Sequence, residues 1–60
     1  MRETVLMKGE MATLVIVTTE AGTEVLDGED EVLEQHAEDC HEAILRQYLD
    51  LGWEIEEDGP

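Results

Sequence analysis

The segment that most constrains the fold of this chain is Leu14-Val15-Ile16-Val17, an unbroken apolar run within Met11–Thr19. Its β-branched residues favour a strand, and a strand without apolar–polar alternation is typical of one buried on both faces of its sheet. A chain of 60 residues is expected to form one domain, 1–60, with 57–60 as a frayed tail. So small a domain cannot easily cover both faces of a sheet by itself, so we expect a second subunit, or another partner, against the open face.

The flanking segments predict the rest of the sheet. Arg2–Met7 predicts a strand joined to Met11–Thr19 by a tight turn at Gly9, which can adopt positive φ. Thr23–Leu26 is either a third short strand or an extended link. Trp53–Glu56 alternates apolar and acidic residues, as expected of a half-buried strand that lies beside the central strand or joins a partner's sheet.

Between these strands, Asp30–Leu51 predicts one long amphipathic helix. Asp27 is the expected N-cap, and Gly52 is expected to end the helix. On a helical wheel, one side carries the apolar residues Leu33, Ala37, Cys40, Ile44, Tyr48 and Leu51. The other side is a predicted acidic face formed by Glu31, Glu34, Glu38 and Glu42.

These elements predict an α+β fold. We expect a three- to four-stranded, mainly antiparallel sheet in the order β-β-(β)-α-β, with the long helix on one face.

The charge balance limits the possible partners. Seventeen Asp and Glu against three Lys and Arg give a net charge of −14, which leaves too few cations to bind phosphates and argues against direct nucleic-acid binding. Three explanations remain: adaptation to molar salt, mimicry of a nucleic-acid polyanion to inhibit a basic partner, or attraction to a basic protein surface. The spread of acids along the chain favours the first, and the composition resembles that of proteins from salt-loving archaea.

A single cysteine allows no internal disulfide and indicates a reducing compartment. The longest apolar run is far shorter than the ~20 residues that span a bilayer. We therefore expect a cytoplasmic protein without membrane contact.

His36 and Cys40 are the weak candidates for chemistry. Their i, i+4 spacing in the predicted helix suits two zinc ligands, and a symmetric dimer would supply four. A free cysteine is more often a small core residue, so we expect neither a metal nor another cofactor. The acids Glu38, Asp39 and Glu42 oppose the thiolate that a nucleophile needs, so we do not expect an enzyme.

The junction after the predicted helix resembles an L-x-x-G-W-E-L pattern found in small uncharacterised domains. The matching residues, under a quarter of the chain, are Leu49, Gly52, Trp53, Glu54 and Ile55. The resemblance implies a helix-to-strand junction and no activity.

The sequence thus predicts a non-enzymatic protein-interaction or regulatory module that forms a homodimer and is adapted to high salt. The alternatives are a polyanion mimic and a metal-binding module. The expected interface residues are Leu14, Val15, Ile16, Val17, Leu45 and Leu49.

Overall fold

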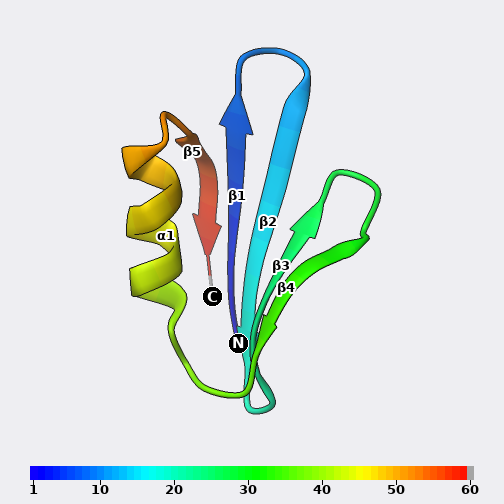
Figure 1. The fold of residues 1–60 in the computed structure, drawn as a ribbon, viewed down its shortest axis with the longest axis vertical. Coiled ribbons are helices and arrows are strands. Elements are labelled where there is room, and N and C mark those ends of the chain that lie inside the picture. The colour runs from blue at the N-terminus through cyan, green and yellow to red at the C-terminus, as the bar shows by residue number, and fades with distance from the viewer. Residues whose placement is uncertain (60) are drawn as a thin grey trace.

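Four consecutive strands form an antiparallel meander, and the fifth strand joins it beside the first. In the computed structural model, which describes residues 1–59, the sheet order is β4-β3-β2-β1-β5. One helix packs on one face of this sheet, which confirms the expected α+β class (Figure 1). The elements are β1 (Arg2–Lys8), β2 (Ala12–Thr19), β3 (Gly22–Asp27), β4 (Val32–His36), α1 (His41–Asp50) and β5 (Glu54–Gly59).

The first three strands follow the sequence prediction. β1 and β2 pair in register from Arg2 opposite Thr18 to Lys8 opposite Ala12. Gly9 has φ 68° in the turn between them. The segment Thr23–Leu26 lies within β3, which pairs with β2 along its whole length, so it is a strand and not a link.

The predicted helix Asp30–Leu51 is wrong in its first half. The 10-residue helix α1 begins at His41, and β4 occupies part of the expected helix. Asp27 does not cap a helix: its Oδ1 accepts hydrogen bonds from the backbone N–H groups of Glu29 (2.8 Å) and Glu31 (3.0 Å). With Asp30 at φ 65°, these bonds form a hairpin turn that returns the chain as β4.

The end of the helix agrees with the prediction. Gly52 adopts φ 99°, and its N–H donates to the carbonyl of Leu49. Trp53 then contacts Tyr48 edge to face, with ring centroids 6.2 Å apart.

β5 takes a position that the sequence left open. It pairs antiparallel with β1, at one edge of the sheet, and not with the central strand β2. The expected frayed tail is wrong for Glu57–Gly59, because these residues pair with Glu3–Val5. Pro60 lies outside the described residues.

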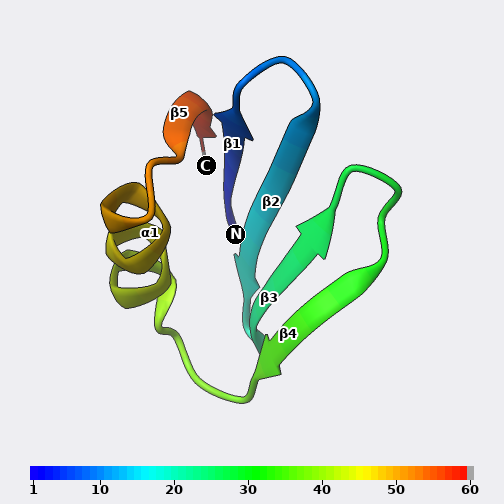
Figure 2. The same ribbon diagram turned by 45° about the horizontal axis from the view of Figure 1, so that its top comes forward.

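The core lies between α1 and one face of the sheet. It consists of Leu6, Leu14, Ile16, Val25, Ile44 and Leu45, each at most 5% exposed. The opposite face is bare of any helix or strand of residues 1–59 (Figure 2). Leu14, Ile16 and Leu45, expected at an interface, are therefore part of the protein's own core.

Two glycines give a matched test of this fold. A Cβ at Gly22, which has φ 128°, would lie 2.0 Å from the carbonyl oxygen of His36, whereas a Cβ at Gly9 has no neighbour within 4 Å. We expect Gly22→Ala to lower the free energy of unfolding by about 3 kcal/mol or more, because strain and a backbone clash add together. Gly9→Ala should lower it by only about 1 kcal/mol. Denaturant unfolding followed by circular dichroism makes the comparison, and equal losses would contradict the close approach of β3 and β4.

Candidate functional site

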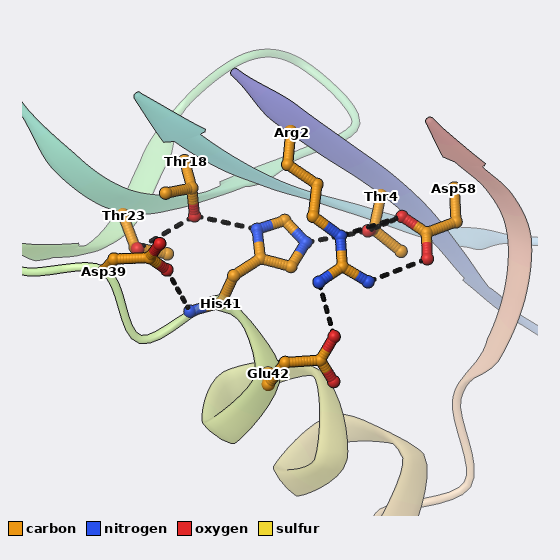
Figure 3. A network of polar contacts seen from close by, with 8 residues as sticks. All are labelled: Arg2, Thr4, Thr18, Thr23, Asp39, His41, Glu42 and Asp58. Carbon is orange, nitrogen blue, oxygen red and sulfur yellow. Dashed lines mark hydrogen bonds and ion pairs between the residues drawn. The ribbon is translucent and has the colours of Figure 1, made fainter. Parts of the chain in front are cut away.

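His41, the first residue of α1, lies against the sheet at the centre of a polar network (Figure 3). Its side chain is only 2% exposed. Both ring nitrogens contact threonine hydroxyls of neighbouring strands: Nε2 lies 2.8 Å from Thr4 Oγ1 in β1, and Nδ1 lies 2.7 Å from Thr18 Oγ1 in β2. The helix is thus joined to two strands through one imidazole.

The hydrogen-bond inventory assigns the proton on this ring. Thr4 donates its hydroxyl hydrogen to Asp58 Oδ1 at 2.7 Å, so its oxygen accepts from His41 and Nε2 carries the hydrogen. In a neutral ring Nδ1 is then an acceptor, and Thr18 donates to it. Thr23, whose oxygen lies 2.9 Å from Thr18 Oγ1, donates its hydroxyl hydrogen to the backbone carbonyl of Glu38 at 3.1 Å. Every hydroxyl hydrogen therefore has a destination when His41 is neutral.

Thr23 and Asp39 take the place of the usual N-cap side chain. Cys40 occupies the N-cap position, but its side chain makes no capping hydrogen bond. Thr23 Oγ1 accepts from the backbone N–H of Cys40 at 3.1 Å, and Asp39 Oδ1 accepts from that of His41 at 3.3 Å. The orphan N–H groups at the helix start are thus bonded partly by the sheet that the helix covers.

Arg2 closes the network on the side of β5. Its Nε and Nη2 donate to the two carboxylate oxygens of Asp58 at 3.2 and 2.9 Å, and its Nη1 donates to Glu42 of α1. The hydrogen bonds that Arg2 donates, with a smaller effect from the bond that Thr4 donates, lower the pKa of Asp58 to about 2. The same carboxylates raise the pKa of Arg2. One guanidinium thereby ties β1, β5 and α1 together.

The chemistry open to His41 is limited. Burial, and then the positive charge of Arg2, lower the pKa of its imidazole below its ordinary value of 6.5. A neutral imidazole at physiological pH is suited to act as a base, yet here both nitrogens are engaged and the ring is out of contact with solvent. The buried imidazole therefore serves to position α1 against β1 and β2.

The metal candidates do not come together as expected. His36 lies in β4, where its Nε2 is 3.2 Å from Glu34 Oε1, and Cys40 is a partly buried residue that packs against the core. The i, i+4 geometry proposed for them required a helix that residues 36–40 do not form. Within residues 1–59, no three His, Cys, Asp or Glu side chains are grouped to hold a metal ion.

The predicted acidic face is also wrong, because only Glu42 of its members lies in α1. Glu31 and Glu38 lie in loops. Glu34, in β4, accepts a hydrogen bond from the hydroxyl of Tyr48. The hydrogen bond from Tyr48, with a smaller effect from the bond with His36, lowers the pKa of Glu34. The same Tyr48–Glu34 bond raises the pKa of Tyr48 to about 12.

The second candidate site is the face of the sheet opposite α1, here called the open face. Residues paired across antiparallel strands point to the same side, and the register Val5–Val15–Leu26–Val32 therefore defines an apolar row across four strands. These side chains, together with Met7 and Val17, are partly or largely exposed. The apolar members of the open face are Val5, Met7, Val15, Val17, Leu26 and Val32.

Acids border this apolar centre. Glu3 and Glu24 pair with Val17 from either side, Glu57 pairs with Val5, and Glu54 pairs with Met7. We call these four acids the rim of the open face. Of the expected interface residues, Val15 and Val17 lie on this face, whereas Leu49, at 39% exposed, lies on α1.

Sequence reasoning missed the network around His41, although a signal for it exists. Thr4, Thr18 and Thr23 each stand two residues from a core residue of their own strand: Leu6, Ile16 and Val25. With a period of two, the three hydroxyls had to point toward the helix side of the sheet. Three inward threonines at one end of a sheet predict a buried polar partner.

Comparison with protein-family models, with curated proteins and with solved structures finds no match. Among residues 1–59, there is no helix with the length and apolar character needed to cross a membrane. The function must therefore be inferred from the two sites themselves.

The network's contribution to stability can be measured at Thr18. The nearly isosteric change Thr18→Val removes the hydroxyl partner of both His41 and Thr23 inside the protein. We expect the free energy of unfolding to fall by about 1–3 kcal/mol, because buried polar groups lose their partner. Thr13→Val, in the same strand but partly exposed on the open face, should change it by less than about 0.5 kcal/mol. Equal effects in denaturant unfolding would contradict the network.

The depressed pKa of His41 predicts loss of stability in mild acid. The unfolded chain, in which the imidazole has its ordinary pKa of 6.5, binds more protons than the folded chain just below that pH. The free energy of unfolding should therefore fall as pH decreases from about 7.5 to 5.5, by at most about 1.4 kcal/mol per pH unit for one proton. The variant His41→Gln should lack this decline and His36→Gln should retain it. A decline that persists in His41→Gln would assign it to another group.

Proposed function

We propose that the protein is a non-enzymatic protein-interaction module whose docking surface is the open face. The observation that supports this proposal is the apolar row from Val5 to Val32, which no element of residues 1–59 covers. A contiguous apolar surface of this kind, rimmed by polar residues, is typical of a protein–protein contact.

The energetics of the row favour a covered state. Apolar surface removed from water contributes about 25 cal/mol per Å², so even partial burial of six aliphatic side chains is a substantial gain for a domain of 60 residues. Among residues 1–59, the core on the helix side contains six buried apolar residues, of which three are fully buried. Covering the open face would give the sheet the second apolar layer that its central strand lacks.

Under this proposal, the role of the acidic residues is to keep the protein surface hydrated in concentrated salt. Carboxylates lie on the rim of the open face, on α1, in the turns and along β5, and they are not gathered into one patch. In molar salt the Debye length is ~3 Å, so their mutual repulsion is screened. Mimicry of a nucleic acid has less support, because Glu34 and Glu42 of the predicted acidic face are engaged by Tyr48 and Arg2.

Site-specific photocrosslinking in the producing cells tests the proposal. A benzophenone amino acid placed at Glu24, on the rim, should give crosslinked adducts of the folded protein. The matched control replaces Glu38, an exposed acid in the loop before α1, whose carbonyl accepts a hydrogen bond from Thr23 on the helix side of the sheet. We expect several-fold more adducts at position 24, since an interface holds the probe against a partner.

Equal adduct yields at the two positions, with both variants folded by circular dichroism, would overturn the proposal. A loss of the adducts at position 24 when Val15 and Val17 are changed to threonine would support it further, because these substitutions keep β-branched shape and remove apolar surface.

A further inference from the structure

We infer that the occupant of the open face is a second copy of this chain, stacked face to face about a two-fold axis and held more tightly as salt rises. The inference rests on the proposed docking function and names its partner.

The shape of the surface suits pairing with itself. A two-fold interface brings the same patch of both subunits together, so the patch must be self-complementary. The centre of the open face consists of Val5, Val15 and Val17, with Leu26 beside them, on neighbouring strands. Short side chains on a regular sheet form a level surface, and two such surfaces stack ~10 Å apart as the sheets of a sandwich do.

The area is enough for a reversible dimer. Along its principal axes the described chain measures 31 × 22 × 19 Å, so one face is at most about 31 Å long and 22 Å wide. One face of this size can bury at most about 600 Å² per subunit, and the pair about 1,000–1,200 Å², near the lower limit of specific interfaces. We therefore expect the dimer to be in equilibrium with the monomer and not permanent.

The distribution of charge favours a second copy over a basic protein. A surface evolved for a basic partner is expected to concentrate acids where that partner sits. Here the rim contributes four acids, Glu3, Glu24, Glu54 and Glu57, out of seventeen in the chain, and the centre of the face is neutral. What distinguishes the open face from the rest of the surface is its apolar centre, not its charge.

The sheet edges are poor alternatives for association. β5 carries Glu54, Glu56, Glu57 and Asp58, and its register with β1 shifts between Val5 and Leu6. At the other edge, the register of β4 with β3 shifts between Val25 and Leu26. Charges and bulges of this kind disfavour edge-to-edge pairing. Leu49 and Leu51, at the end of α1, are also exposed, but the open face carries the larger set of apolar residues on neighbouring strands.

The rim makes dimerisation depend on salt. In a face-to-face dimer the acidic rims of the two subunits lie close together, and each subunit has a net charge of −14. Their repulsion is felt across a Debye length of ~10 Å at 0.1 M salt and only ~3 Å at 1 M. Salt therefore strengthens this dimer, whereas it would weaken a complex with a basic partner.

Sedimentation equilibrium of the full chain in KCl tests the inference. The dissociation constant of the dimer should fall by about tenfold or more between about 0.1 and 2 M KCl. The double variant Val15→Thr with Val17→Thr should weaken the dimer at least tenfold while circular dichroism shows the same fold. Leu49→Gln, a control on the exposed side of α1, should leave the constant within about twofold.

Removal of charge from the rim gives an independent test of the dimer. The triple variant Glu3→Gln, Glu24→Gln and Glu57→Gln removes rim charges and should strengthen the dimer at low salt. The matched triple Glu20→Gln, Glu29→Gln and Glu38→Gln removes the same charge from turns and loops and should strengthen it less. Equal effects would show that only net charge matters and would overturn the face-to-face arrangement.

A folded chain that stays monomeric at all salt concentrations, or a dimer unaffected by the Val15 and Val17 changes, would overturn the inference. The proposed function is judged separately by the crosslinking at position 24. Adducts there of twice the chain mass support a second copy. Adducts with other proteins alone preserve the docking function and reject the second copy.

Discussion

A single helix of 10 residues can cover only one face of a five-stranded sheet, and the rest of this structure follows from that constraint. The covered face buries Leu6, Ile16 and Val25 completely, while Val5, Val15 and Val17 on the other face stay partly exposed. The two faces of β1 and β2 are both aliphatic, so the fold leaves apolar surface that an isolated domain of this size has no layer to bury. The uncovered apolar face, which we propose as the docking surface, follows from the small number of residues in the chain.

The polar network around His41 adds to the small core by fixing the orientation of the helix on the sheet. Where aliphatic packing ends, Thr4, Thr18 and Thr23 receive His41 and the N–H group at the start of α1. Within residues 1–59, no buried side-chain nitrogen or oxygen lacks a hydrogen-bond partner. A fully satisfied buried network specifies one orientation of the helix, which apolar contacts alone do less sharply. Arg2 and Asp58 extend this specification to the edge strand β5.

Acidic and apolar side chains differ in how they are distributed over the surface. The acids are dispersed over turns, edges and helix, where water and salt screen them. Six apolar residues line the open face, and further apolar side chains, such as Leu49 and Leu51, are exposed at the end of α1. Such an arrangement would let one chain remain highly charged and still form the proposed dimer. It would also make the proposed dimer depend on the salt concentration, because the charge of each subunit opposes contact more strongly when screening is weak.

Local chemistry was sufficient to predict several elements from the sequence. The β-branched and aliphatic residues of β1 and β2, with Gly9 between them, indicated the hairpin, Gly52 indicated the end of the helix, and the unbroken run Leu14–Val17 indicated a sheet with two apolar faces. These features depend on neighbours along the chain, so they can be read without knowing what packs where.

The tertiary structure decided what local patterns left ambiguous. Val32–His36 fits the apolar arc of a helix equally well, but the Asp27-Gly28 turn places it beside the free edge of β3, where ladder hydrogen bonds outweigh helix propensity. The same pairing separates His36 from Cys40 and makes His41 the buried histidine. Sequence determined which faces are apolar; only the fold decided which of them the single helix covers, because that choice depends on contacts between segments far apart in the chain.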